Sequence, residues 1–215
     1  MMIDFNAHFG SDPSMPATYS EAELMALLKA AGIDRAVATD LNERGQTQFP
    51  QGVRVYPTYE PIDFAGAAMQ EMLGRGLILQ VYLRLQDPRV LLQAVSSAEM
   101  IAALDSIAEA HKDTRFVISG ATLAEATVNP ELFTRENVWM DISHVQHPTN
   151  SLEKLIDAIG SSRILFGTNA PIFYPYANVF RVMNSKITDE DRERILWKNA
   201  AGLLGPEARQ WSILT

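Results

Sequence analysis

The chain of 215 residues contains no cysteine and only four histidines. The absence of cysteine excludes disulfides, thiolate zinc sites, iron–sulfur clusters and cysteine nucleophiles. Basic runs are also absent. Eighteen Lys and Arg residues against 26 Asp and Glu give a net charge of -8, which disfavours binding to nucleic-acid phosphates or to anionic lipid. We therefore expect no nucleic-acid partner.

Long hydrophobic runs are missing as well. The first ten residues lack the basic region and long apolar core of a secretory signal, because an aspartate stands at position 4. The longest uncharged stretch, residues 164–180, contains two prolines and two asparagines and makes a poor membrane span. These features predict a cytoplasmic protein with no membrane contact.

Short apolar runs alternate along the chain with longer segments whose apolar residues lie three or four apart, which predicts alternating strands and helices. Several runs, such as LILQVYL and RILFG, are almost continuously apolar, as is typical of parallel strands covered on both faces. The eight predicted strands are residues 3–8, 35–39, 53–59, 77–83, 90–95, 115–119, 138–143 and 163–167.

Helices are predicted between several of these strands. One begins after Ser20 as its N-cap and ends at Gly32, and two others cover residues 97–110 and 151–159. Near the end of the chain, Thr188 precedes Asp191 by three residues, a pattern similar to a capping box. The apolar stripe expected in that last helix is Ile195, Leu196, Ala200, Leu203 and Leu204.

The alternation predicts a parallel sheet, and eight strands favour a closed (β/α)₈ TIM barrel of the α/β class. An open doubly wound sheet is the alternative, but it normally carries a glycine-rich phosphate loop after the first strand, where this chain has HFGSDPS. The segment between the second and third strands and the segment between the fourth and fifth strands are too short or too irregular for a full crossover helix. We therefore predict a compact, irregular barrel, formed as one domain by residues 1–215.

The active site of such a barrel lies at the carboxyl ends of its strands. Alternation along the fourth strand places Tyr82 and Arg84 on one face, so Arg84 is expected either to hold an anion or to pair with Asp87 in a surface loop. The polar residues at the strand ends are Asn6, His8, Asp40, Tyr59, Glu60, Tyr82, Arg84, Ser96, Ser119, His144 and Asn169.

The first strand, IDFNAHFG at residues 3–10, resembles the first strand of the amidohydrolase superfamily, in particular its amidohydrolase-2 branch, whose signature is an Asp followed by His-x-His. The resemblance continues through AGIDRAV at residues 31–37 and NVWMDIS at residues 137–143. It is clearest at RILFGTNAP, residues 163–171, which is similar to a family strand ending in Gly-Thr-Asp-x-Pro, and at NAAGLLG, residues 199–205. These blocks follow the family's order.

The resemblance implies a metal-dependent barrel hydrolase or a decarboxylase, with divalent ions held by His-x-His, by later strand-end histidines and by the final Asp. This sequence departs from that pattern: Asn6 replaces the first histidine, Asn169 replaces the final aspartate, and Ser119 ends a strand that should close with a ligand histidine. Only His8 remains in place, and an amide cannot act as a general base. We predict either no cofactor or a weakly bound divalent metal, zinc being the first choice.

The histidines carry open alternatives. His8 is either a metal ligand or acid–base group, or a ring whose hydrogen bonds are satisfied by Asp4, Asn6 or a backbone carbonyl. His144 and His147 lie three apart and either complete an improvised three-histidine site with His8 or remain loop residues. His111, at a predicted helix end, is expected to be structural or solvated.

Three further features remain open. Asn169 either binds a ligand or caps the next turn, and Glu60 either replaces the lost base or begins an ordinary loop. The aromatic segment at residues 172–176 forms either a wall over the mouth or a subunit contact in a possible homodimer.

Two functions follow from these residues. The first is an enzyme that hydrolyses a C–N or C–O bond, or decarboxylates, a small anionic molecule. In that enzyme His8, Asn169 and Glu60 are catalytic, whereas Asn6, Tyr82, Arg84 and His144 bind the substrate; His8 and His144 are weak metal ligands. The second is a catalytically inactive relative that binds a small molecule or regulates another process. Fold alone does not decide between them, because function depends on the site.

Overall fold

The structure is a computed structural model, and it describes residues 1–11, 18–42, 53–56, 73, 78–84 and 97–205. Its strands are β1 (Ile3–Phe9), β2 (Arg35–Asp40), β3 (Val53–Tyr56), β4 (Ile78–Tyr82), β5 (Arg115–Ser119), β6 (Val138–Asp141) and β7 (Ile164–Leu165). Its helices are α1 (Glu21–Ala30), α3 (Ser97–Ala110), α4 (Leu123–Val128), α5 (Pro130–Phe133), α6 (Ser151–Ile159), α7 (Pro175–Asn184), α8 (Asp189–Glu193) and α9 (Asn199–Leu204), with a 3₁₀ turn η1 (Ser161–Arg163) and a π-helical turn η2 (Arg194–Lys198).

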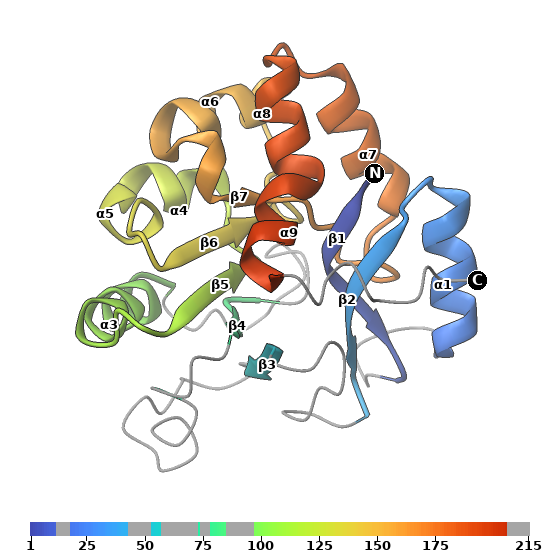
Figure 1. Ribbon diagram of the computed structural model, residues 1–215, viewed down its shortest axis with the longest axis horizontal. Coiled ribbons are helices and arrows are strands. Elements are labelled where there is room, and N and C mark those ends of the chain that lie inside the picture. Colours follow the sequence, from blue (N-terminus) through green and yellow to red (C-terminus); the bar gives the residue numbers. More distant parts are fainter. Residues whose placement is uncertain (12–17, 43–52, 57–72, 74–77, 85–96, 206–215) are drawn as a thin grey trace.

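All paired strands are parallel. β1 pairs with β2, and the other five follow the order β3-β4-β5-β6-β7 (Figure 1). The chain that continues from β7 lies against β1, because the Phe5 amide donates to the Phe166 carbonyl at 2.8 Å and the His8 amide donates to the Ala170 carbonyl at 2.7 Å. The strands therefore follow one another as β2-β1-β7-β6-β5-β4-β3.

Seven of the eight predicted strands are present within the described residues, with ends that differ by a few positions. The remaining one, the fifth predicted strand at residues 90–95, lies outside the described residues. Positions 57–59 of the third predicted strand also lie outside them. The connections expected to lack helices include residues 43–52 and 85–96, which are also outside them.

The helices lie around the outside of the strands (Figure 1). The predicted helix starts are confirmed: the Glu23 amide donates to Ser20 Oγ at 3.3 Å while the Ser20 amide donates to Glu23 Oε2 at 2.8 Å, a complete capping box. At the start of α8, the Asp191 amide donates to Thr188 Oγ1 at 3.1 Å. These caps fix where each helix begins, and the apolar stripe that must be buried sets which face is turned toward the strands.

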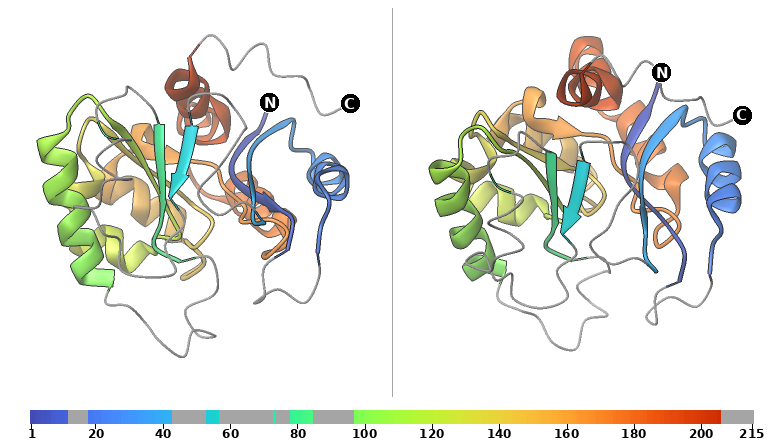
Figure 2. Two further views of the ribbon diagram at one scale, coloured as in Figure 1. Left: turned by 90° about the horizontal axis from the view of Figure 1, so that it is seen from below. Right: turned by 60° about the horizontal axis from the view of Figure 1, so that its bottom comes forward.

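The inward-facing side chains change character along each strand. Val37, Ile78, Val117 and Leu165 belong to one buried cluster with Phe5, whereas the residues two positions further on in β2, β4 and β5 are polar. We call the first set the apolar layer; its buried members are Ile3, Phe5, Val37, Ile78, Val117, Leu165, Ala200 and Leu203. Figure 2 shows α9, which contributes the last two, beside the start of β1 at the end of the molecule where the strands begin.

Side chains beyond that layer form a polar layer at the carboxyl ends of the strands. Its members are all buried and comprise Asn6, His8, Thr39, Gln80, Tyr82, Ser119, Asp141, Ser143 and Asn169. None of the helices within the described ranges is both long enough and apolar enough to cross a membrane.

Candidate active site

The seam between β1 and the chain after β7 is held by a buried aspartate. Asp4 accepts hydrogen bonds at Oδ1 from the Asn6 and Thr168 amides, both at 3.0 Å, and at Oδ2 from the Thr168 hydroxyl at 2.5 Å. Burial raises the pKa of Asp4 to about 7, although the hydrogen bonds from Thr168 and Asn6 lower the pKa and the charge of Asp141 adds to the rise. Asp4 therefore joins the two segments that carry His8 and Asn169.

His8 and Asn169 face each other across this seam. His8 Nε2 lies 2.9 Å from Asn169 Oδ1, and both side chains are fully buried. A carbonyl oxygen only accepts, so the ring nitrogen carries the hydrogen. Asn169 has a φ of 58°, a left-handed conformation that is uncommon for residues other than glycine. Its amide donates to the Asn6 carbonyl at 2.7 Å and its carbonyl accepts from the Phe173 amide at 3.0 Å, which holds this conformation in place.

Asn6 is the centre of a second group of contacts. Its Nδ2 donates to Ser143 Oγ at 3.0 Å and lies 3.3 Å from Asp141 Oδ2, while its Oδ1 accepts from the Tyr82 hydroxyl at 3.1 Å. The Ser143 amide donates to Asp141 Oδ1 at 2.8 Å. The amide of Asn6 thus links β1 to both β4 and the end of β6.

Gln80 makes a third link across the interior. Its Nε2 donates to the Phe5 carbonyl at 2.9 Å and to Ser119 Oγ at 2.8 Å. Ser119, the residue in place of an expected histidine ligand, is therefore a hydrogen-bond partner of β4. The Tyr82 ring, two residues further along β4, lies 5.4 Å from the His8 ring.

Arg84 lies at the end of β4 but turns toward helix α4. Its Nη1 donates to Glu125 Oε2 at 2.7 Å and to the Gly120 carbonyl at 2.6 Å, and its Nη2 contacts Glu125 Oε1. Alternation does not fix its direction because β4 ends at Tyr82. The partner is thus Glu125 rather than Asp87, which lies outside the described residues, and the anion-binding role of Arg84 stays a prediction.

The other predicted residues are distributed as follows. The His144 ring packs on Phe173 with centroids 4.9 Å apart, and its Nδ1 lies 3.1 Å from Ser143 Oγ. His147 is exposed, and His8, His144 and His147 do not form a group that could hold a metal ion, so the three-histidine alternative is not formed. His111 follows the end of α3. Glu60 and Tyr59 lie outside the described residues. The aromatic side chains of residues 172–176 do not all lie on one side. Phe173 packs on His144, whereas the ring of Tyr174 stacks on that of Tyr176 with centroids 5.0 Å apart and is exposed.

Sequence reasoning missed several members of this site. Asp4, Asp141 and Ser143 each take part in at least two of its hydrogen bonds, and none was selected as a functional residue. A signal was available, because Asp4-x-Asn6-x-His8 and Asp141-x-Ser143 each alternate polar residues along a strand whose surroundings are apolar.

The polar layer does not fit the divalent metal implied by the family resemblance. The described residues contain no group of three His, Cys, Asp or Glu side chains that could hold an ion. Asn169 supplies a neutral amide oxygen, and that oxygen accepts a hydrogen bond from His8 Nε2. A metal ion would need this same nitrogen as its ligand, without the hydrogen. Both polar atoms of the Asn6 side chain are also engaged by protein groups. No step of the chemistry below is assigned to a metal.

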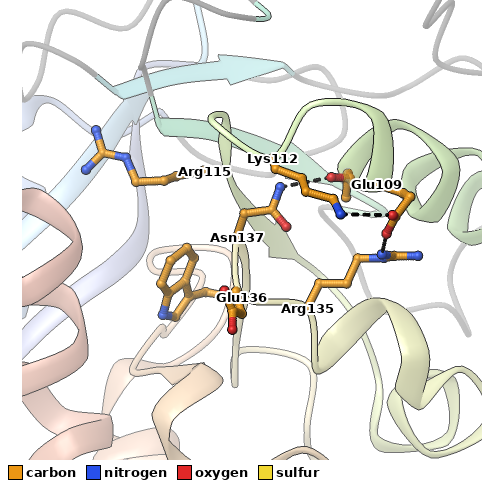
Figure 3. Close-up of a pocket in the computed structure, with 8 residues that line it drawn as sticks. Glu109, Lys112, Arg115, Arg135, Glu136 and Asn137 are labelled. Atoms are coloured by element: carbon orange, nitrogen blue, oxygen red, sulfur yellow. Dashed lines mark hydrogen bonds and ion pairs between the residues drawn. The ribbon is translucent and has the colours of Figure 1, made fainter.

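A separate surface pocket of about 420 Å³ lies near the starts of β5 and β6. Glu109 stands between Lys112, at 3.1 Å, and Arg135, and Asn137 donates to the Ala108 carbonyl at 3.0 Å (Figure 3). The pocket's acidic and basic groups thus largely pair with each other. It lies at the opposite end of the strands from His8, and we assign it no role in the chemistry.

Comparison with known proteins supports the architecture. The sequence profile of the family described as Amidohydrolase matches residues 3–205. No curated protein sequence matches the chain.

Three solved structures are similar. The 5-carboxyvanillate decarboxylase LigW from Sphingomonas paucimobilis is 10% identical, with 94% of this chain and 98% of that chain covered at a TM-score of 0.73. A zinc-bound amidohydrolase from Burkholderia multivorans is 13% identical, with 94% of this chain and 98% of that chain covered at a TM-score of 0.66. An uncharacterised TIM-barrel protein from Bordetella bronchiseptica is 15% identical, with 94% of this chain and 98% of that chain covered at a TM-score of 0.62. The predicted compact, irregular TIM barrel is confirmed.

Proposed function

Because the chain belongs to the amidohydrolase family, we propose that it decarboxylates a small carboxylated molecule at the carboxyl end of the barrel, with His8 as the proton donor. The predicted amidohydrolase-like protein of hydrolase or decarboxylase type is confirmed by the family match. The reaction, its substrate and the residues that perform it form the proposal. One observation carries it: the hydrogen bond of 2.9 Å between His8 Nε2 and Asn169 Oδ1.

Decarboxylation is favoured over hydrolysis because of the groups that the site provides. Hydrolysis needs a base that activates water, and Asn169 cannot accept a proton. The carboxylates of Asp4 and Asp141 each accept hydrogen bonds from neighbouring protein groups and are fully buried. Removal of a carboxylate needs one proton donor aimed at the carbon, and an imidazolium can fill that role.

The proposed step transfers one proton. His8, as the imidazolium, gives its Nε2 proton to the carbon that carries the carboxylate. The bond between that carbon and the carboxylate breaks, its electron pair returns to the carbon skeleton, and CO₂ leaves. Solvent then restores the imidazolium. Asn169 fixes the direction of the Nε2–H before the substrate takes its place, and Tyr82 and Asn6 border the reacting carbon.

The structural neighbour named for 5-carboxyvanillate decarboxylation suggests the substrate class, a hydroxylated aromatic acid. The test measures CO₂ release from 5-carboxyvanillate and from simple hydroxybenzoic acids, with and without a chelator. We expect release that the chelator does not change and that falls about 10²–10⁴-fold in His8→Ala. His147→Ala, which changes an exposed histidine outside the site, is the matched control.

Two results would overturn this assignment. Loss of activity with chelator and recovery with zinc or manganese would make the reaction metal-dependent, and binding without turnover of any acid would favour the inactive binding module.

A second copy of the chain is the partner that we propose for α7. Tyr176, Phe180 and Met183 lie on one face of this helix because they are spaced by four and three residues, and Tyr174 extends the face. Tyr174 and Phe180 are each 69% exposed. Aromatic side chains cover about 150–250 Å² each, so this stripe supplies roughly half of the ~800 Å² that each partner buries in a stable dimer. A two-fold axis lets the same stripe pack on itself.

Sedimentation measures this association directly. We expect the wild type to be a dimer at micromolar concentration and Phe180→Ser to be a monomer. Val128→Ser, which removes an isolated side chain that is 77% exposed on α4, should leave the dimer intact. A monomeric wild type would refute the proposal. The composition and charge remain the basis for our proposal of a cytoplasmic location.

A further inference from the structure

On two residues of the polar layer, Thr39 and Gln80, buried polar atoms have no hydrogen-bond partner among the described residues. They are the hydroxyl oxygen of Thr39 and the carbonyl oxygen Oε1 of Gln80. Thr39 is 5% exposed and Gln80 is fully buried. A buried polar group without a partner destabilises the folded state, and native proteins rarely keep such groups. These two atoms therefore call for a physical reason.

Their positions relate both atoms to His8. Thr39 is the residue of β2 that pairs with His8 of β1 in the parallel register. Neighbouring residues of paired strands direct their side chains to the same face, so the Thr39 hydroxyl shares the inward face with the His8 ring. Gln80 lies on β4 two residues before Tyr82, whose ring is 5.4 Å from His8.

The Gln80 side chain is already fixed in direction. Because its Nε2 is held by the Phe5 carbonyl and Ser119 Oγ, its Oε1 cannot turn to find another donor without breaking these two bonds. Thr39 is a β-branched residue with a stiff χ1 angle. Both groups are therefore held in place while their hydrogen-bonding capacity is unused, which is the arrangement expected of a prepared recognition site.

We propose that Thr39 Oγ1 and Gln80 Oε1 recognise a hydroxyl group of the bound molecule, next to the carbon that His8 protonates. A hydroxyl carries a single hydrogen, which it can donate to the Gln80 carbonyl, while its oxygen accepts the hydrogen of the Thr39 hydroxyl. A site built in this way discriminates against an analogue without the hydroxyl, because the two protein atoms then stay unsatisfied. This inference rests on the proposed function only in placing the bound molecule beside His8.

The experiment compares Thr39→Val with the wild type in two measurements. The first is the affinity for 2-hydroxybenzoate, 4-hydroxybenzoate and benzoate by calorimetry. The wild type should bind at least one hydroxybenzoate more tightly than benzoate, and Thr39→Val should weaken that hydroxybenzoate about 3- to 10-fold without changing benzoate. Thr39→Ser keeps a hydroxyl and should restore most of the preference.

The second measurement is thermal unfolding without ligand. Thr39→Val replaces an unsatisfied hydroxyl by a methyl group of the same shape, so its melting temperature should equal or exceed that of the wild type. Thr168→Val is the matched control. Its hydroxyl is bonded to Asp4 at 2.5 Å, and its loss should lower the melting temperature by several degrees.

Three outcomes would overturn the inference. They are a fall in the melting temperature of Thr39→Val as large as that of Thr168→Val, equal binding of hydroxybenzoates and benzoate by the wild type, and no binding of any of the acids. If the preference for the hydroxyl is present but no acid releases CO₂, the proposed reaction fails and this recognition site stands.

Discussion

The two ends of the barrel interior are built on the same strands from opposite kinds of side chain. Toward the strand starts, Phe5, Val117 and Leu165 pack with Leu203 of α9 in an entirely apolar cluster. Toward the strand ends, the side chains of Asn6, His8 and their neighbours are buried to the same degree but bond to one another. Burial is equal at the two ends, so the difference lies in the free energy of burial, which is favourable for the apolar side chains and must be offset by hydrogen bonds for the polar ones.

That difference separates stability from chemistry. The apolar layer gains free energy simply by leaving water, in proportion to its area. The polar layer gains little net free energy from each hydrogen bond and loses much if one partner is removed. Groups that can transfer protons or recognise a ligand are therefore concentrated where the structure gains least from them, on a frame fixed by the other end.

The largest expected effect comes from the apolar layer. Phe5→Ala leaves a cavity beneath the polar layer and should lower the free energy of unfolding by about 3–5 kcal/mol. Chemical denaturation measures this loss. The Phe5 amide donates to the Phe166 carbonyl and the Phe5 carbonyl accepts from Gln80 Nε2. Alanine retains both of these backbone groups of residue 5, so binding of a hydroxybenzoate at low temperature should change less than the stability. Equal losses in both would show that the two layers are not separable.

An effect of intermediate size is expected from Asp4, which ties the polar layer together. The pKa of Asp4 is about 7 in the folded chain, well above the ordinary aspartate value of 3.8. The proton is therefore bound more tightly in the folded state, and this stabilisation is complete below about pH 4 and is lost as pH rises through 7. From pH 5 to 8 the loss amounts to ~3 kcal/mol.

Asp4→Asn removes this titration and keeps a carbonyl acceptor for the two amides. Denaturation curves of both proteins between pH 5 and 8 give the free energy of unfolding at each pH. The contribution of Asp4 is the difference between the two proteins in how this free energy changes with pH. We expect the free energy of unfolding to fall with pH in the wild type relative to the variant. A difference that does not change with pH would contradict the raised pKa.

The smallest effect is expected outside both layers. Ser20→Ala removes the side-chain half of the capping box at the start of α1 and should cost about 1 kcal/mol with no effect on ligand binding. Chemical denaturation and calorimetry test the two parts of this statement. A change in ligand affinity would mean that α1 communicates with the polar layer, in conflict with the separation of the two ends.

Much of the fold follows from local sequence pattern. Seven predicted strands and the helices that begin after Ser20 and Thr188 are present in the described residues, because period and capping depend on residues within a few positions of each other. The number of predicted strands and their alternation with helices predicted the closed barrel. His8 and Asn169 were also expected near each other on the resemblance, and the structure joins them by a hydrogen bond.

The partners of the polar side chains were not predictable in this way. Arg84 was expected to meet an anion or Asp87, and it pairs with Glu125, 41 residues further along the chain. Whether a given polar atom is paired at all depends on which strands meet and at what register. No pattern in the sequence distinguishes the satisfied hydroxyl of Thr168 from the unsatisfied one of Thr39.

The sequence by itself thus determined the elements, their order and the asparagines at positions 6 and 169, where the family resemblance implies metal ligands, since these are properties of residue type and local spacing. Only the tertiary structure decided what replaces them. Asp4 and Thr168 are 164 residues apart, and their contact exists because β1 closes against the chain after β7. Hydrogen bonds act over about 3 Å, so their pattern is set only when distant segments have been brought into register.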